Sequence, residues 1–381
     1  MYSPEFNIGS LILYVTIAII CCCCLKMSIR GIYCSRSEIL RTDLGYIYTC
    51  IILILFAICR KVSANIGGAD ALNYESIFLD ALNSQSKYDS QEVLFGVFNR
   101  IIRSFTSNPI LYRSICYSII AFSYIIFIKC FSEKWMSVIP YLVIVLFYLK
   151  SFNTMRSSLA VAIFTIALVL LYKNKKIIAF SLIISTVFIH RMSVLYIPFI
   201  IFYFFGYKFI INMGLKRMIF FLILYSWITY IIATSIQTFV LGAMLLDGTD
   251  SYYLQKNMNG SIFDSSILLL PLIALLIFWF ITNRKLNVDN RTEFLTVCIA
   301  YDIIIAPAAI LLGMWRFNEF MFLERLTVWG VLISLYRIRF ERKSRILVTL
   351  LFVCIFLGWL IYRIEREWDP CKIMPYIFIW D

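Results

Sequence analysis

The stretch Lys150–Leu171, KSFNTMRSSLAVAIFTIALVLL, decides the fold class of this chain. Every residue after Arg156 in this stretch is apolar or carries a hydroxyl group, which is typical of a helix that crosses the hydrocarbon core of a membrane. Arg156 then stands at the membrane boundary. A fixed cation at this position either marks the topology of the chain or belongs to an anion-binding site, and both interpretations stay open on this stretch alone.

The composition extends the membrane assignment to the whole chain. Of its 381 residues, 62% are hydrophobic and 15% are charged, whereas soluble domains carry about 25% charged residues. Each spanning helix needs about 20 apolar residues, so the chain has room for about ten to twelve of them. The net charge of +13 fits basic cytoplasmic loops, and we therefore expect no nucleic acid partner.

Apolar runs separated by charged clusters predict an all-α polytopic membrane protein with about twelve transmembrane helices. The chain is predicted to form a single integral membrane domain, residues 1–381, with outer loops at 60–109 and 241–264. The predicted spans are 9–25, 43–59, 110–128, 136–149, 155–172, 177–190, 192–206, 218–240, 265–282, 294–313, 317–336 and 346–362.

The basic residues predict the orientation. More than half of the 35 Lys and Arg residues fall in the six short loops that follow every second span. Short basic loops face the cytoplasm, so both termini and the loops 60–109 and 241–264 are predicted to lie outside. Two features oppose this orientation, namely Arg60-Lys61 at the start of the first outer loop and the basic residues of the C-terminal tail.

The outer loop 60–109 is predicted to hold two helices. Asp70 is a suitable N-cap for the segment ALNYESIFLDAL, and a second, amphipathic helix covers Ser90–Phe105. Its predicted apolar face consists of Leu94, Phe98, Ile101, Ile102 and Phe105. This helix either lies flat on the membrane surface or packs over the helical bundle.

Three short outer connections carry arginine, namely Arg156, Arg191 and Arg316. The positive-inside bias disfavours these positions. Because the planar guanidinium group suits phosphate oxygens, the three arginines together predict a site for a diphosphate at the outer leaflet. The alternative is that each side chain reaches the lipid headgroups separately.

The other polar candidates are a deeper pair and three possible bases. Asp302 and Arg325 lie within predicted spans 294–313 and 317–336 at comparable depth, which predicts an ion pair or a shared polar cavity. The candidates for a general base are His190, Asp70 and Glu92. Twelve cysteines accompany a single histidine without metal-ligand spacing, so we expect no metal site and no cofactor.

Several short motifs resemble the EpsG-like branch of the bacterial Wzy-type polysaccharide polymerases. They are Gly68-Ala69-Asp70 with Tyr74, Glu92-Val93-Leu94-Phe95, Met155-Arg156-Ser157-Ser158-Leu159-Ala160, the basic turn Lys173–Lys176, Phe188-Ile189-His190-Arg191-Met192-Ser193, and Arg316 among aromatic residues. The segments around Arg156 and His190 are the most specific of these.

The resemblance implies a multi-pass enzyme of the bacterial inner membrane with both termini periplasmic. Such enzymes are metal-independent, inverting glycosyltransferases that join undecaprenyl-diphosphate-linked oligosaccharide repeat units into O-antigen, capsule or exopolysaccharide. On this reading Arg156, Arg191 and Arg316 bind the diphosphate, and His190, Asp70 or Glu92 removes the proton of the acceptor. Membrane lipid surrounds the enzyme, and a chain-length regulator and a flippase are candidate partners.

Two other functions stay open from the sequence. A flippase or transporter for lipid-linked oligosaccharide would also bind a diphosphate, but its charges would line a cavity reachable from both faces of the membrane. A surface-polysaccharide ligase would share the lipid donor and a similar set of His and Arg residues.

Overall fold

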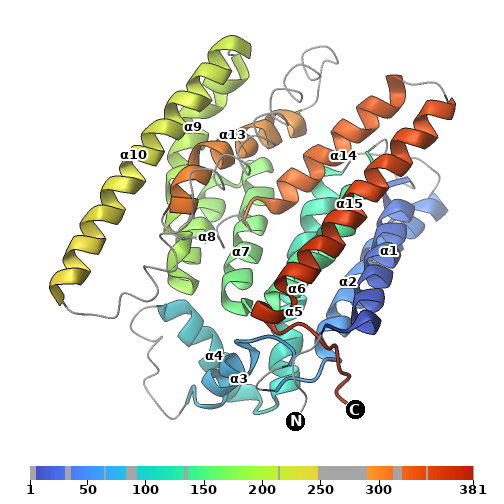
Figure 1. Ribbon diagram of the computed structural model, residues 1–381, viewed down its shortest axis with the longest axis vertical. Helices are drawn as coiled ribbons and strands as arrows, with labels where there is room; N and C mark the ends of the chain where they lie inside the picture. Colours follow the sequence, from blue (N-terminus) through green and yellow to red (C-terminus); the bar gives the residue numbers. More distant parts are fainter. Residues whose placement is uncertain are drawn as a thin grey trace. The chain divides into compact units, whose positions relative to one another are not determined.

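The computed structural model describes residues 6–30, 36–63, 66–82, 92–132, 136–212, 215–247, 290–311, 320–339 and 342–380. Within these ranges the chain forms helices and no β-sheet (Figure 1). The predicted all-helical class is therefore confirmed for the described residues.

The chain divides into two compact units. The first consists of Met1–Arg191 with Trp329–Asp381, and the second of Met192–Val328. The helices of the first unit are α1 (Ile8–Arg30), α2 (Arg36–Ile58), α3 (Ala71–Leu79), α4 (Val93–Phe105), α5 (Pro109–Phe131), η2 (Ile139–Val143), α6 (Ile144–Ser151), α7 (Met155–Tyr172), α8 (Lys176–Ile189) and α15 (Arg342–Cys371). The second unit contains α9 (Ile197–Asn212), α10 (Leu215–Asp247) and α13 (Asn290–Leu311). The two sequence boundaries between the units fall within η3 (Arg191–Tyr196) and α14 (Phe322–Arg339).

Four helices are long and apolar enough to cross a membrane. They cover Ile8–Ile29, Pro109–Phe131, Met155–Tyr172 and Arg345–Glu365. Five shorter apolar helices cover Leu44–Ile58, Ile139–Ser151, Lys176–Ile189, Arg191–Phe205 and Ile219–Ile232. The predicted span 265–282 and most of the predicted loop 241–264 lie outside the described residues. The total of about twelve spans thus stays a prediction.

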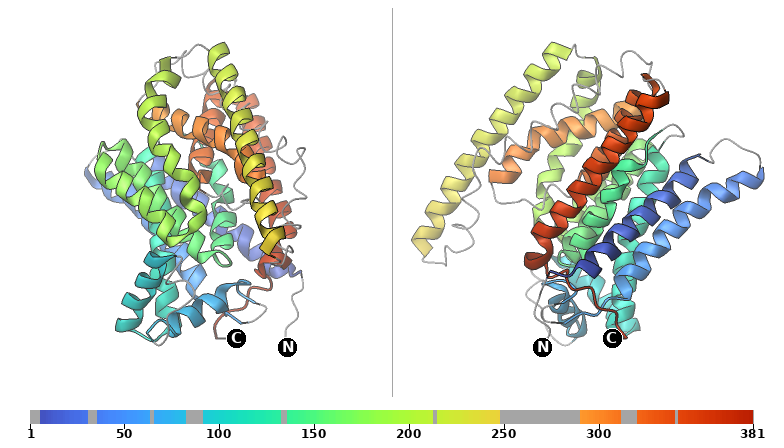
Figure 2. Two further views of the ribbon diagram at one scale, coloured as in Figure 1. Left: turned by 90° about the vertical axis from the view of Figure 1, so that its left-hand side faces the viewer. Right: turned by 45° about the vertical axis from the view of Figure 1, so that its right-hand side comes forward.

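The predicted span 155–172 coincides with α7, which is the central helix of the first unit. Within its most apolar window 72% of the residues are buried, against 11% for α15. Helix α7 packs on α5 and α8, whereas α15 lies beside α1 and η2 (Figure 2). The predicted span 136–149 is formed instead by the 3₁₀ helix η2 followed by α6, with Pro140 in the first turn of η2, where a missing N–H is tolerated.

The outer loop forms helices α3 and α4, which pack on each other, and α4 also packs on α8 (Figure 1). The predicted apolar face of α4 is only partly buried within the protein, and whether its exposed part lies on the membrane surface stays a prediction. Phe95, Asn99 and Ile102 are buried, whereas Ile101 and Phe105 are exposed. Neighbouring helices α3 and α8 select the buried face, and these contacts are not encoded in the periodicity of α4 itself.

Asp70 occupies the N-cap position of α3, but its side chain makes no capping hydrogen bond. Its backbone N–H instead donates to Asn153 Oδ1 at 2.9 Å. The preceding Gly68 has φ +117°, and a Cβ atom there would overlap the carbonyl group of Phe152. A glycine is therefore required where the outer loop approaches the α6–α7 connection.

In the second unit, hydroxyl groups of α10 bond the backbone of α13. Ser226 Oγ donates to the Ile303 carbonyl at 3.2 Å, and Thr229 Oγ1 donates to the Ile304 carbonyl at 2.6 Å. Pro307 has no N–H, so the Ile303 carbonyl lacks its usual partner four residues later. The hydroxyl of Ser226 supplies the missing donor, as apolar surroundings require.

We expect Gly45→Ala to destabilise the first unit. Its Cβ would overlap the Cys24 carbonyl and Ser28 Oγ where α1 and α2 pack together, and overpacking of this kind costs about 1–3 kcal/mol. Gly358→Ala in α15 is the control, since nothing lies within 4 Å of its Cβ position. The apparent Tm in detergent measures both. An equal Tm for the two variants would contradict the close approach of α1 and α2.

Candidate functional site

The carboxylate of Glu92 gathers groups from three helices of the first unit. Its Oε2 lies 2.5 Å from Nη1 of Arg156, at the start of α7. Its Oε1 accepts a hydrogen bond of 3.1 Å from the backbone N–H of Arg191 and lies 3.4 Å from Nδ1 of His190. Four residues from three separate motifs of the sequence, Glu92, Arg156, His190 and Arg191, thus meet at one place.

Helix ends place these side chains. Glu92 is the N-cap residue of α4, Arg156 lies in the first turn of α7, and His190 is the C-cap residue of α8. A cation in the first turn of α7 faces the positive end of the helix dipole, which is unfavourable. The Glu92 carboxylate offsets this arrangement by placing a negative charge at the same end.

Because the Glu92 carboxylate is buried, its ionisation depends on the groups that surround it. Glu92 is 4% exposed. Burial opposes its ionisation, but the His190 ring, the Arg156 guanidinium and the Arg191 N–H together outweigh this effect, so the pKa of the Glu92 carboxyl is lowered. Glu92 is therefore an anion at neutral pH and a weak base, which argues against it as the proton acceptor.

The second titratable group of the cluster is His190. Its ring is buried, and its Nε2 atom makes no hydrogen bond to a described residue. Its Nδ1 atom faces the Glu92 carboxylate at 3.4 Å. A hydrogen on Nδ1 would suit this contact and would leave the lone pair on Nε2, which is the tautomer that a histidine needs in order to accept a proton through Nε2.

The structure does not bring every predicted site residue to this cluster. The Asp70 carboxylate makes no hydrogen bond or ion pair to a described residue. Arg191 contacts Glu92 through its backbone, and its side chain is exposed. Arg316 lies outside the described residues. Phe95, one turn after Glu92 in α4, was not among the predicted site residues, but its ring centre lies 5.9 Å from the Arg156 guanidinium carbon.

Asp302 and Arg325 form a separate pair in the second unit. Arg325 Nε and Nη2 donate to the two carboxylate oxygens of Asp302 at 2.6 and 2.7 Å. Asp302 is fully buried. This bidentate geometry gives both oxygens of the carboxylate a donor. The pair thus stabilises the junction of α13 with the start of α14.

Among the described residues, no group of three or more His, Cys, Asp or Glu side chains is arranged to bind a metal ion. The Glu92 cluster holds one imidazole, one buried carboxylate, the guanidinium group of Arg156 and the backbone N–H of Arg191. Such a set can accept a proton and stabilise negative charge on phosphate oxygens.

The lowered pKa of Glu92 predicts how the site responds to acid. Its ionised form stabilises the fold fully above the unfolded-state pKa of about 4.3, and this stabilisation is lost as the pH falls through the lower folded-state pKa. We expect the wild type to have a higher Tm than Glu92→Gln at pH 7, and the difference to shrink below about pH 4. A difference that is independent of pH would contradict the bound carboxylate.

Removing one member of the Asp302–Arg325 pair should harm the fold more than removing both. Asp302→Ala leaves a cation without its carboxylate, which costs about 3–5 kcal/mol in a buried site. We expect the double variant Asp302→Ala/Arg325→Ala to recover part of the Tm and of the yield of folded protein. Glu365→Ala, at an exposed position of α15, is the control. A double variant less stable than Asp302→Ala would contradict this account.

A comparison with known families identifies the family of the chain. No curated protein and no solved structure matches the chain. The EpsG family, whose members are Wzy-like polysaccharide polymerases, matches residues 45–378, nearly the whole chain and all four residues of the Glu92 cluster. The chain belongs to the EpsG family and is a membrane protein of polysaccharide biosynthesis.

Proposed function

We propose that this protein polymerises oligosaccharide repeat units carried on undecaprenyl diphosphate, at the outer face of the bacterial inner membrane. The growing glycan of one lipid carrier is transferred to the non-reducing end of a second lipid-linked repeat unit. The observation that carries the proposal is the buried Glu92–His190–Arg156 cluster in a member of a polymerase family. We also propose that both termini lie on the periplasmic side and that a chain-length regulator and a flippase are partners of the protein.

The proposed step is a single displacement with inversion at the anomeric carbon. The acceptor hydroxyl oxygen forms a bond to this carbon, and the bond between the carbon and the diphosphate oxygen breaks. The electron pair leaves with undecaprenyl diphosphate, and the acceptor proton moves to His190 Nε2. Proton transfer to a positioned histidine contributes typically 10²–10⁴-fold to a rate. Since the His190 ring is 5% exposed, the acceptor reaches Nε2 only after a neighbouring side chain moves.

Glu92 serves this step as an orienting residue. Its carboxylate holds Nδ1 of His190, so that the imidazole keeps Nε2 for the acceptor. The same negative charge stabilises the imidazolium that forms when the proton arrives. The lowered pKa keeps the carboxylate ionised throughout the reaction.

Arginines serve the leaving group. Arg156 is 17% exposed at its side chain, and the Arg191 side chain is exposed, so both combine a fixed position with access to a ligand. With Arg316 they would bind the diphosphate and stabilise the charge that develops on it. Fixed guanidinium groups can neutralise diphosphate charge as a divalent cation does, so the proposed reaction needs no metal.

We expect His190→Gln and Arg156→Gln to reduce polymer formation by about 10²-fold or more, because one removes the base and the other a charge opposite the leaving group. Lys173→Gln, at the exposed opposite end of α7, is the matched control and should keep wild-type activity. The measurement is the glycan length distribution in cells that lack the chromosomal gene, normalised to folded protein. Wild-type polymer from both site variants would overturn the proposal.

The same cells separate a polymerase from a ligase and from a flippase. Loss of a polymerase leaves surface lipid capped by a single repeat unit. Loss of a ligase leaves the surface lipid uncapped, and loss of a flippase leaves the lipid-linked repeat unit on the cytoplasmic side. The first result is expected for His190→Gln, and either of the others would replace the proposed function.

A further inference from the structure

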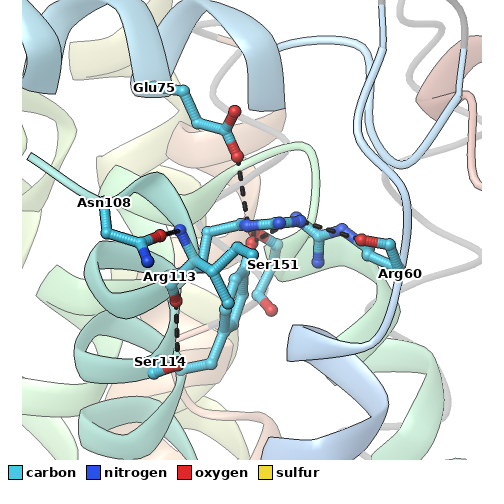
Figure 3. A network of polar contacts seen from close by, with 8 residues as sticks. Arg60, Glu75, Asn108, Arg113, Ser114 and Ser151 are labelled. Carbon is cyan, nitrogen blue, oxygen red and sulfur yellow. Dashed lines mark hydrogen bonds and ion pairs between the residues drawn. The ribbon is translucent and has the colours of Figure 1, made fainter. Parts of the chain in front are cut away.

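A second buried cluster lies at the junction of α2, α3, α5 and α6 (Figure 3). Arg113 of α5 lies 3.1 Å from the Glu75 carboxylate of α3 and donates from Nη1 to the Arg60 carbonyl at 2.9 Å. Arg60 Nη2 donates to the Tyr117 hydroxyl at 2.8 Å, and this hydroxyl lies 3.4 Å from the Ser151 carbonyl of α6. The cluster joins four segments that are far apart in the sequence.

Arg60 is 1% exposed and therefore does not face the solvent as a topology marker would. Its guanidinium carbon lies 3.7 Å from the centre of the Phe152 ring and 4.8 Å from that of the Tyr117 ring. A planar cation over an aromatic face is attracted to the ring, and more strongly where little water is present. Arg60 thus holds Phe152 in place through its flat face.

The C-terminal segment fixes the backbone on either side of Arg60. The Lys61 N–H donates to the Ile377 carbonyl, and the Ile379 N–H donates to the Cys59 carbonyl, both at 2.8 Å. Tyr376 also stacks on Phe56, whose ring lies 5.6 Å from that of Phe152. Arg60 is therefore a fixed support and has little freedom to follow Phe152 if that residue moves.

Phe152 is connected to the Glu92 cluster by a short and rigid path. It is the C-cap residue of α6, and only Asn153 and Thr154 separate it from α7. Asn153 receives the Asp70 N–H, while Thr154 Oγ1 donates to the Lys150 carbonyl at 3.0 Å. Arg156 follows in the first turn of α7 and contacts Glu92. A displacement of the Phe152 ring would therefore shift the start of α7.

We propose that Arg60 is a positioning residue, which sets the place of Arg156 in the active site through Phe152 and the α6–α7 connection. The inference rests on the proposed function of the Glu92 cluster. Arg60 touches neither Glu92 nor His190, and it acts only by fixing where α7 begins. A lysine cannot replace it, since an ammonium group offers neither the flat face for Phe152 nor a fork of N–H donors.

The test measures polymerisation by purified protein with the lipid-linked repeat unit of its host, per folded molecule. Arg60→Lys is expected to lower the rate roughly tenfold, because small displacements of catalytic groups are costly. Lys61→Gln, a half-buried neighbour, is the control and should leave the rate unchanged. A wild-type rate for folded Arg60→Lys, together with losses for His190→Gln and Arg156→Gln, would overturn this inference alone.

A double-mutant cycle distinguishes positioning from general stability. If Arg60 acts through Arg156, the variant Arg60→Lys/Arg156→Lys should be at most about twofold slower than Arg156→Lys, because coupled residues are not additive. If the rate loss of the double variant equalled the product of the two single losses, the proposed action of Arg60 through Arg156 would be contradicted. A merely structural role would lower the Tm and the yield of folded protein but not the rate per folded molecule.

Two further variants serve if Arg60→Lys does not fold. Phe152→Leu removes the ring on which Arg60 stacks, and Tyr117→Phe removes only the hydroxyl acceptor of Nη2. We expect a large loss of rate for Phe152→Leu and a smaller one for Tyr117→Phe. A rate per folded molecule at the wild-type level in both variants would overturn the inference.

Discussion

The ion pair of Glu92 with Arg156 is the interaction on which the arrangement of α4, α7 and α8 depends. A carboxylate that is taken out of water is stable only if charged and hydrogen-bonding groups surround it. Here those groups come from the start of α7 and the end of α8, so a single side chain at the beginning of α4 fixes three helix ends. The residues best suited to chemistry are held at these helix ends.

The α6–α7 connection is held from two sides. On one side, Arg60 stacks on Phe152 and is itself tied to α5 and to the C-terminal segment. On the other, the outer loop donates an N–H to Asn153 and approaches Phe152 through Gly68. The packing of apolar helices stabilises the fold, while the α6–α7 connection determines where Arg156 lies.

The sequence predicted the helices better than the contacts between them. An apolar run is a local property, and α7 begins and ends where the run of residues 155–172 does. The buried face of α4 depends on α3 and α8, which its own periodicity does not reveal. Glu92 and His190 were recognised as possible bases, but their division of roles required the contact between them. Arg60 illustrates the same limit, since its charge suggested an orientation signal and its burial shows a packing role.

The hydroxyl groups of Ser226 and Thr229 have a consequence for the history of the family. Ser226 compensates a backbone carbonyl that Pro307 leaves without a donor, and Thr229 bonds the carbonyl that follows. We therefore expect Pro307 and the hydroxyl of Ser226 to be conserved together, although they lie on different helices. Relatives that keep the proline should keep a small hydroxyl residue opposite it. Those that have lost the proline are free to carry alanine or valine there, which makes this pair a marker for aligning distant members.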